Sequence, residues 1–221
     1  EQVYVWATSW GVSTRLIGAI VMAHGDDKGL RLPPNLAPVQ VVVVPIYRKD
    51  EERAQVMEVV SKIESALDGV RVKVDDRDQF KPGFKYNQWE QAGVPLRMEI
   101  GPRDVVNGQV VLARRDTGEK SSSPIDGIKE VVSCLLNEIQ QGLFDQALAF
   151  RQEHTYRADD YDVFQEQLEG GFVLAHWCGS EDCEASVQEE TRATIRCITF
   201  DREQEQGACI YCRQPSEGRV V

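Results

Sequence analysis

Four of the six cysteines stand in two close pairs near the end of the chain, with spacings typical of metal ligands. Cys178 and Cys183 enclose four residues, and Cys209 and Cys212 enclose two. Small neighbours such as Gly179 allow tight turns that aim two thiolates at one point. Because zinc prefers a tetrahedron of thiolates, the tetrad predicts a structural zinc site without an open coordination position.

Two alternatives to a metal site stay open: Cys209 and Cys212 could form a redox pair, or the four cysteines could be unrelated. A redox CxxC motif usually opens a helix, whereas a proline-containing stretch, 213–215, follows this one. The sequence has no export signal, so we expect a reducing, cytoplasmic environment, where clustered cysteines bind metals more often than they form disulfides. Cys134 and Cys197 are predicted to be ordinary core residues.

Arg15 is a second residue that could do chemistry. A polar turn with Gly11 delivers it to the start of an apolar run, 16–22, which is predicted to be helical. A guanidinium is planar and always charged, so it could bind a phosphate or stack on a purine there. An arginine at such a junction is also compatible with a plain surface or capping role.

The composition limits the possible partners. A formal net charge of −11 argues against broad, sequence-independent binding of nucleic acid, although residues 97–120 are locally richer in arginine. No apolar run is long enough for a membrane span, so we expect no membrane partner. The chain begins in strand-like residues, 3–6, without an initiator methionine. We therefore expect the natural protein to be longer.

The middle of the chain alternates strand and helix patterns. Strands are predicted at 40–46, 70–74, 95–100 and 109–114, and helices at 51–67, with Asp50 as N-cap, and at 125–150. Such alternation indicates an α/β layer around a largely parallel or mixed sheet. The remainder, 151–221, predicts a helix at 161–168 and strands at 172–177 and 193–198. So small an α+β domain often needs a metal to supplement its core.

Several stretches together resemble prolyl-tRNA synthetases, class II aminoacyl-tRNA synthetases, of the archaeal/eukaryotic-like type. The string Thr8-Ser9-Trp10-Gly11-Val12-Ser13-Thr14-Arg15 and the following residues to Pro34 resemble motif 3 of that family. Further similar stretches are 37–42, 89–90, 93–97, 99–104 and 114–120, and the two cysteine pairs resemble the family's zinc-binding C-terminal domain. The resemblance covers essentially the whole chain, in order, as the C-terminal half of such an enzyme.

The resemblance implies three domains. Residues 1–36 would be the end of the catalytic domain, a remnant of its antiparallel sheet. Residues 37–150 would form the mixed-sheet anticodon-binding domain with its long C-terminal helix, and 151–221 the small zinc-binding domain.

The resemblance also implies the activity of a proline–tRNA ligase: ATP-dependent activation of proline, with magnesium, and transfer to tRNA(Pro) by a homodimer. Arg15 would stack on adenine and reach the ATP phosphates, and Ser13 would also contact ATP. Trp10 and Gly11 would line the proline pocket, where an indole and a bare backbone select a small, rigid ring by its shape.

Four residues match the positions with which the family reads the two guanines of proline anticodons. Tyr86 offers a stacking face, Glu90 an acceptor for guanine N–H groups, and Arg97 and Lys120 donors for guanine oxygens or phosphate. In the plainer alternative, Glu90 faces solvent, and Arg97 forms an ordinary surface ion pair with Glu99 or Asp104 that contributes little.

The 221 residues lack counterparts of motif 1, which builds the family's dimer, and of motif 2, which supplies a second phosphate-binding arginine. We therefore expect this polypeptide alone to be inactive, with residues 1–36 lacking their partner. A stand-alone tRNA anticodon-binding accessory module and a zinc-stabilised α/β interaction domain are the alternatives. An ATP-stacking arginine beside a proline pocket favours the ligase, since a pure binding module has no use for one.

Overall fold

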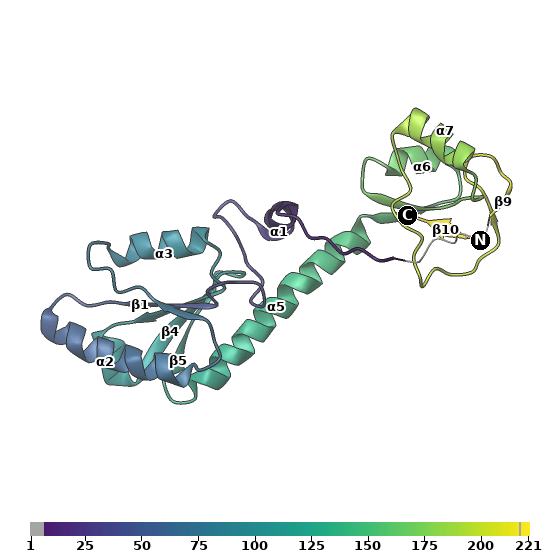
Figure 1. The fold of residues 1–221 in the computed structure, drawn as a ribbon. Helices are drawn as coiled ribbons and strands as arrows, with labels where there is room; N and C mark the ends of the chain where they lie inside the picture. The colour runs from purple at the N-terminus through teal and green to yellow at the C-terminus, as the bar shows by residue number, and fades with distance from the viewer. Residues whose placement is uncertain (1–6, 217) are drawn as a thin grey trace. The chain divides into compact units, whose positions relative to one another are not determined.

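The computed structural model describes residues 7–216 and 218–221, so the strand-like residues 3–6 lie outside the described range (Figure 1). The chain groups into two units, residues 1–147 and 148–221, each with its own sheet and core. The finer division of the first unit at residue 36 stays a prediction.

The first unit is built on a mixed sheet of five strands. In chain order they are β1 (Val41–Pro45), β2 (Val72–Val74), β3 (Leu96–Ile100), β4 (Gln109–Arg114) and β5 (Lys120–Pro124). The order across the sheet is β2-β1-β3-β4-β5, with β2, β1 and β3 parallel and β4 and β5 antiparallel. The mixed sheet predicted from the sequence is confirmed. The sequence did not indicate β5, because its serines show no apolar alternation and pairing with β4 makes it a strand.

The helices that begin in this unit are α1 (Arg15–His24), α2 (Asp50–Ala66), α3 (Pro82–Gln91), α4 (Pro102–Asn107) and α5 (Ile128–Glu153). The sequence did not indicate α3 and α4, which lack an apolar stripe of helical period; each starts with a proline at its first position. The prediction of Asp50 as N-cap was wrong, because Asp50 is already helical and Lys49 is the N-cap. Among the described residues, no helix combines the length and apolarity needed to cross a bilayer.

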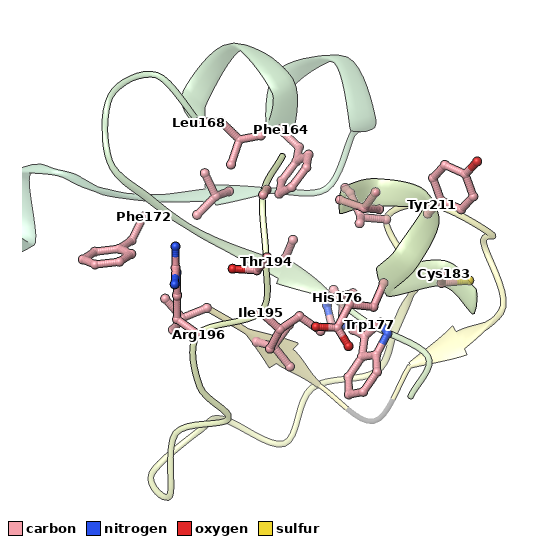
Figure 2. A pocket seen from close by; sticks show the side chains of 18 of the residues that line it. Phe164, Leu168, Phe172, His176, Trp177, Cys183, Thr194, Ile195, Arg196 and Tyr211 are labelled. Atoms are coloured by element: carbon pink, nitrogen blue, oxygen red, sulfur yellow. The ribbon is translucent and has the colours of Figure 1, made fainter. Parts of the chain in front are cut away.

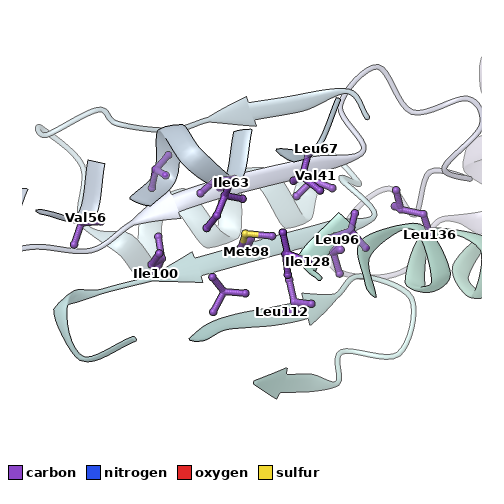
Figure 3. Close-up of a cluster of buried hydrophobic side chains, with 14 residues drawn as sticks. Val41, Val56, Ile63, Leu67, Leu96, Met98, Ile100, Leu112, Ile128 and Leu136 are labelled. Carbon is purple, nitrogen blue, oxygen red and sulfur yellow. The ribbon is translucent and has the colours of Figure 1, made fainter. Parts of the chain in front are cut away.

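The sheet is covered on both faces, which explains the uninterrupted valine run of β1. Val41 and Val43 face the main core, which α2 and α5 cover, whereas Val42 and Val44 face the side chains of α3. Figure 3 shows the main core, with Ile63 of α2 beside the sheet. By the same alternation, every second residue of β3 lies on the α3 face of the sheet.

Cys134 lies on an exposed face of α5, and residues 7–36 form one helix without a sheet. Cys134 of α5 is exposed, 3.5 Å from the Glu138 carboxylate, so its prediction as a core residue was wrong. The buried stripe of α5 passes through Ile128, Val132 and Leu136 instead, leaving Cys134 on another face. Residues 7–36 contain α1, which buries none of its residues, and no strand of a sheet. A catalytic-sheet remnant therefore stays a prediction.

The second unit has a small three-stranded sheet in the order β10-β7-β6. Its elements are β6 (Thr155–Ala158), α6 (Tyr161–Gln167), β7 (Phe172–His176), α7 (Glu181–Thr191), β8 (Gly207–Ala208), β9 (Pro215–Ser216) and β10 (Arg219–Val220). Its core consists of five buried residues: Ala158, Phe164, Val173, Ala175 and Ile210. This core is small enough for a further stabilising element to be needed.

The predicted strand at 193–198 is wrong. Within the described part of the chain, the segment makes two main-chain bonds to the chain end, from Arg196 N to Val221 O at 2.7 Å and from Val221 N to Cys197 O at 3.0 Å. It therefore lacks the ladder that would make it a strand. Cys197 is exposed there rather than buried, contrary to expectation.

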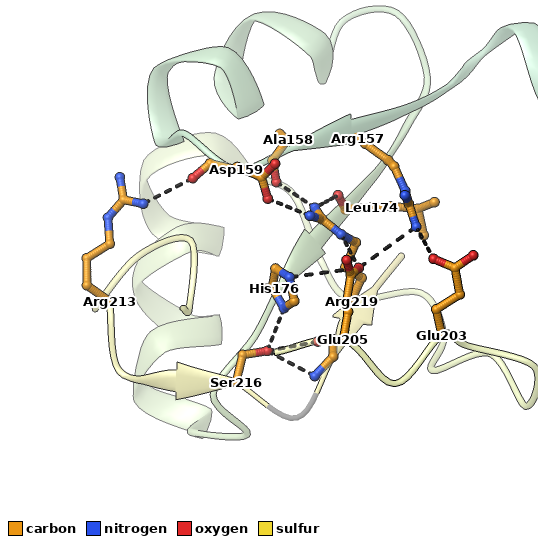
Figure 4. Close-up of polar contacts among 11 residues, drawn as sticks. Arg157, Ala158, Asp159, Leu174, His176, Glu203, Glu205, Arg213, Ser216 and Arg219 are labelled. Atoms are coloured by element: carbon orange, nitrogen blue, oxygen red, sulfur yellow. Dashed lines mark hydrogen bonds and ion pairs between the residues drawn. The ribbon is translucent and has the colours of Figure 1, made fainter. Parts of the chain in front are cut away.

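Arg219 of β10 holds the small sheet together (Figure 4). Its guanidinium donates to the carbonyls of Ala158 and Leu174, at 3.0 and 3.2 Å, and pairs with Asp159 and Glu205. An arginine fork can satisfy several carbonyl and carboxylate acceptors at once because its five donors are fixed in one plane. One side chain thus links β10 to the end of β6 and to the middle of β7.

We expect Ile63→Ala to lower the free energy of unfolding by about 2–5 kcal/mol, because it opens a cavity in the main core. Val106→Ala is the matched control, since Val106 is 85% exposed and its truncation leaves the core intact. Urea denaturation followed by circular dichroism measures both. Equal stability of the two variants would contradict this placement of α2 on the sheet.

Candidate functional site

A cavity of about 210 Å³ opens in the first unit where the end of α3, the α3 face of the sheet and the β4–β5 turn meet. Three of the four residues predicted to read an anticodon line it: Glu90, Arg97 and Lys120. The charged residues of its lining are otherwise all cationic: Lys28, Arg114 and Arg115. The chain as a whole is acidic, and each of these cations is paired with a carboxylate: Lys28 with Glu90, Arg97 and Lys120 with Glu99, Arg114 with Asp116, and Arg115 with Asp26.

Tyr86, the fourth predicted residue, lies beside the cavity on the inner side of α3. The Arg97 guanidinium carbon is 4.2 Å from its ring centroid and the Lys120 ammonium 5.4 Å. Cations over an aromatic face are attracted by the ring quadrupole. The structure therefore brings all four predicted residues together, but Arg97 covers the face of Tyr86 that was expected to stack on a base.

Glu99 joins the two cations from the same strand face. Its Oε1 accepts from Arg97 Nε at 3.1 Å and from Lys120 Nζ at 2.8 Å. Burial raises the pKa of Glu99, but the bonds from Lys120 and Arg97 outweigh it, so that the pKa lies below its usual range. The ion pair between Arg97 and Glu99 is not the exposed surface pair of the plainer alternative, because the two side chains are only 15% and 12% exposed.

The sequence already contained a signal for Glu99. Residues 97 and 99 are two apart in a strand, so their side chains must share a face. Arg97 and Lys120 thus share the carboxylate of Glu99, and these three side chains together keep one net positive charge.

A buried carboxylate, Asp75, fixes the rotation of α3 above the sheet. Asp75 is 2% exposed and accepts from Arg77 Nε and Nη2 at 2.8 and 2.7 Å and from Trp89 Nε1 at 2.7 Å. Lys85 Nζ donates to the Asp75 carbonyl at 2.9 Å. Trp89 and Lys85 both belong to α3, so these bonds set which residues of the helix face the cavity. The hydrogen bonds from Arg77 are the main cause that lowers the pKa of Asp75 to about 2.

The two cysteine pairs come together as predicted. The ligand atoms of Cys178, Cys183, Cys209 and Cys212 all lie within 4.8 Å of one another, and Sγ of Cys212 is 3.6 Å from Sγ of Cys178. Sulfurs at about 2.3 Å from a tetrahedral metal are about 3.8 Å apart, so the cluster has the size of a metal site. All four thiols are free, and no disulfide links them.

The backbone favours the thiolate at one of the four cysteines, Cys209, whereas burial raises the pKa of Cys183 to about 12. Burial raises the pKa of Cys209, but backbone N–H groups of Cys212, Tyr211 and Cys178 outweigh it and bring the pKa to about 7. The second pair lies between the short strands β8 and β9 rather than at the start of a helix. The cluster can therefore hold a metal ion through four sulfurs.

A cavity of about 260 Å³ lies next to this cluster in the second unit (Figure 2). Its walls are mainly apolar and include Phe164, Val173 and Ile210 of the small core. Cys183 and Cys209 also line it. The cysteines and the core thus share a wall, so the packing of one depends on the position of the other.

The residues predicted for ATP and proline lie on the surface in and before α1. Arg15 is the first residue of the helix, and its backbone N–H donates to Ser13 Oγ at 3.3 Å. Trp10 is 93% exposed, and a side chain at Gly11 would meet no atom within 4 Å. Their roles stay predictions.

Comparison with known families defines the class of protein. Residues 40–135, which hold the sheet and all of the cavity lining except Lys28, match the anticodon binding domain family. Residues 161–221, which hold the cysteine cluster, match the family described as prolyl-tRNA synthetase, C-terminal. The chain therefore carries an anticodon-binding domain and a synthetase C-terminal domain.

Similar curated proteins are named proline–tRNA ligase. The chain is 51% identical to the one from Roseiflexus sp. (strain RS-1) and 53% to that from Chloroflexus aggregans, in each case over 99% of this chain and 46% of the relative. That of Porphyromonas gingivalis (strain ATCC 33277) is 49% identical, over 99% and 45%. The chain thus spans about half the length of the curated relatives it matches. It fits the C-terminal part of a prolyl-tRNA synthetase, as its motifs indicated.

We expect Asp75→Asn to lower the free energy of unfolding by about 2–4 kcal/mol at pH 7, because it leaves Lys85 and Arg77 without their anion. The pKa of Asp75 is lower in the folded than in the unfolded chain. Its stabilisation is therefore complete above about pH 4 and is lost as the pH falls toward about 2.

The measurement is urea denaturation of wild type and variant between pH 7 and pH 3. Asp68→Asn, an exposed aspartate in the same unit, is the control and should change little at any pH. A difference between wild type and Asp75→Asn that does not shrink below about pH 4 would contradict the role given to the Asp75 charge.

Proposed function

We propose that this chain supplies anticodon recognition to a proline–tRNA ligase, which activates proline with ATP and transfers it to tRNA(Pro) in the cytoplasm. The observation that carries the proposal is the cavity that gathers Glu90, Arg97 and Lys120 in an anticodon-binding domain. The names of the relatives agree with it.

The chemistry of the cavity suits guanine in a splayed single strand. Guanine offers N–H donors on its Watson–Crick edge, which a carboxylate such as Glu90 accepts, and oxygen and nitrogen acceptors, which Arg97 and Lys120 can reach. Tyr86 supports both cations from below. Because Glu99 neutralises only part of their charge, a guanine or its phosphate can compete for them.

We assign Arg15 and Ser13 to the ATP site and Trp10 and Gly11 to the proline pocket. Their exposure supports this, since they are free to meet other parts of a longer protein. Arg15 would stack on adenine and offset phosphate charge. A complete site needs a second phosphate-binding arginine, magnesium with the ATP and a homodimer, so the chain alone is inactive.

We assign a structural zinc ion to Cys178, Cys183, Cys209 and Cys212. Four sulfurs in a cluster of tetrahedral size and a small adjoining core support this assignment. A site with four protein ligands has no position for substrate, so zinc would stabilise the second unit and take no part in the reaction.

We expect the chain to bind tRNA(Pro) more tightly than the same tRNA with both anticodon guanines replaced, by a factor that persists at several salt concentrations. Fluorescence anisotropy measures both affinities. Glu90→Gln, Arg97→Ala and Lys120→Ala should each cost about 1–3 kcal/mol of binding free energy and reduce the discrimination.

Arg53→Ala is a matched control for Arg97→Ala. Arg53 also lies over a tyrosine ring, that of Tyr47, and also pairs with a carboxylate, Asp78, but it belongs to α2. Its removal should leave tRNA binding unchanged. Equal binding of both tRNAs, vanishing with salt, would reduce the site to a nonspecific phosphate contact and refute the proposal.

We expect one zinc ion per chain, measured by inductively coupled plasma mass spectrometry, because four thiolates complete one tetrahedron. Cys212→Ser should lose the zinc, whereas Cys134→Ser and Cys197→Ser, at exposed cysteines outside the cluster, should keep it. Chelation should raise amide hydrogen exchange in the second unit but not in the first. Retention of zinc by Cys212→Ser would contradict the assignment.

A further inference from the structure

The turn after α1 is held directly against the end of α3. The backbone N–H of Leu30 donates to the Gln91 carbonyl at 3.1 Å, and that of Leu32 to the Gly93 carbonyl at 3.1 Å. Gly29, with φ +130°, comes so close that a Cβ would lie 2.6 Å from the Gln91 backbone. Only glycine permits this contact, which places the turn at the wall of the anticodon cavity.

One buried arginine side chain stabilises the contact between this turn and α3. Arg115, whose side chain is 6% exposed, donates to the two Asp26 carboxylate oxygens at 2.8 and 2.6 Å and to the Glu90 carbonyl at 2.9 Å. The bonds from Arg115 hold the pKa of Asp26 well below its usual range. The turn, the β4–β5 connection and α3 are thus joined at one point, which fixes the backbone of Lys28 near that of Glu90 and leaves their side chains free to move.

Lys28 Nζ lies 3.6 Å from Glu90 Oε1, and both residues line the cavity. Their side chains are 70% and 29% exposed, so the pair is loose and worth little in water. By contrast, Lys120 donates to Glu99 at 2.8 Å. A ligand can therefore break this ion pair at a small cost in free energy and bind both the Lys28 ammonium and the Glu90 carboxylate.

Guanine has the edge that fits such a pair. Its O6 acceptor stands beside the N1–H and N2–H₂ donors, whereas adenine presents a donor amino group where guanine has O6. A carboxylate only accepts and an ammonium only donates. We propose that Lys28 is a specificity-determining residue, donating from Nζ to O6 of one anticodon guanine while Glu90 accepts from N1–H and N2–H₂. This rests on the proposed function, since it requires an anticodon in the cavity.

The test measures anisotropy of the full chain with tRNA(Pro) carrying guanine, 2-aminopurine or inosine at each anticodon guanine in turn. 2-Aminopurine lacks O6 and also the N1–H donor, whereas inosine keeps both and lacks only the N2 amino group. Lys28→Ala should weaken binding of the natural tRNA about tenfold, the order expected for a charged hydrogen bond. At one of the two positions this loss should vanish with 2-aminopurine and persist with inosine.

Two further variants make the result specific. Lys28→Arg keeps a donor at the site and should restore most of the binding to guanine. Lys62→Ala removes another exposed lysine that pairs with a glutamate, Glu58, on α2, and should change nothing.

A Lys28→Ala loss of equal size with every base, with a smaller salt dependence, would make Lys28 a phosphate contact and overturn the proposal. No loss at all would overturn it as well. In both cases a wild-type chain that still prefers guanine leaves the proposed function standing. A wild-type chain that ignores all base changes overturns both.

Discussion

The buried carboxylate of Asp75 is the interaction on which the site of the first unit depends. Asp75 follows β2, and its carboxylate accepts hydrogen bonds from Arg77 and from Trp89 of α3. Lys85 of α3 donates to the backbone carbonyl of Asp75. A buried charge is tolerated only when its partners surround it, so α3 cannot rotate without leaving Asp75 unpaired. That orientation points Tyr86 at the sheet and Glu90 at the cavity edge.

The sheet supplies the remaining residues of the site, because successive side chains of a strand point to opposite faces. β3 sends its apolar residues into the main core and turns Arg97 and Glu99 toward α3. Lys120 reaches the same carboxylate from β5. Both cations lie over the face of the Tyr86 ring, which holds them together in a chain of strong net negative charge.

The second unit has a smaller apolar core than the first. Its cluster of buried apolar residues is small, and polar contacts supplement it. Arg219 links β10 to β6 and β7 through carbonyls and carboxylates, and the cysteine cluster gathers two turns that are distant in the sequence. Polar contacts of Arg219 thus do here part of what apolar packing does in the first unit.

The sequence by itself determined the elements with strong periodicity, such as β1 and α2, and the cysteine tetrad, because each is a local pattern. It missed α3 and β5, whose residues carry no apolar period and which exist because the sheet pairs or covers them. It also misplaced Cys134 and Cys197 in the core, since apolar neighbours do not specify which face is buried. Only the tertiary structure placed Lys28 beside Glu90, because hydrogen bonds between distant segments, closed by Arg115 and Asp26, decide that contact.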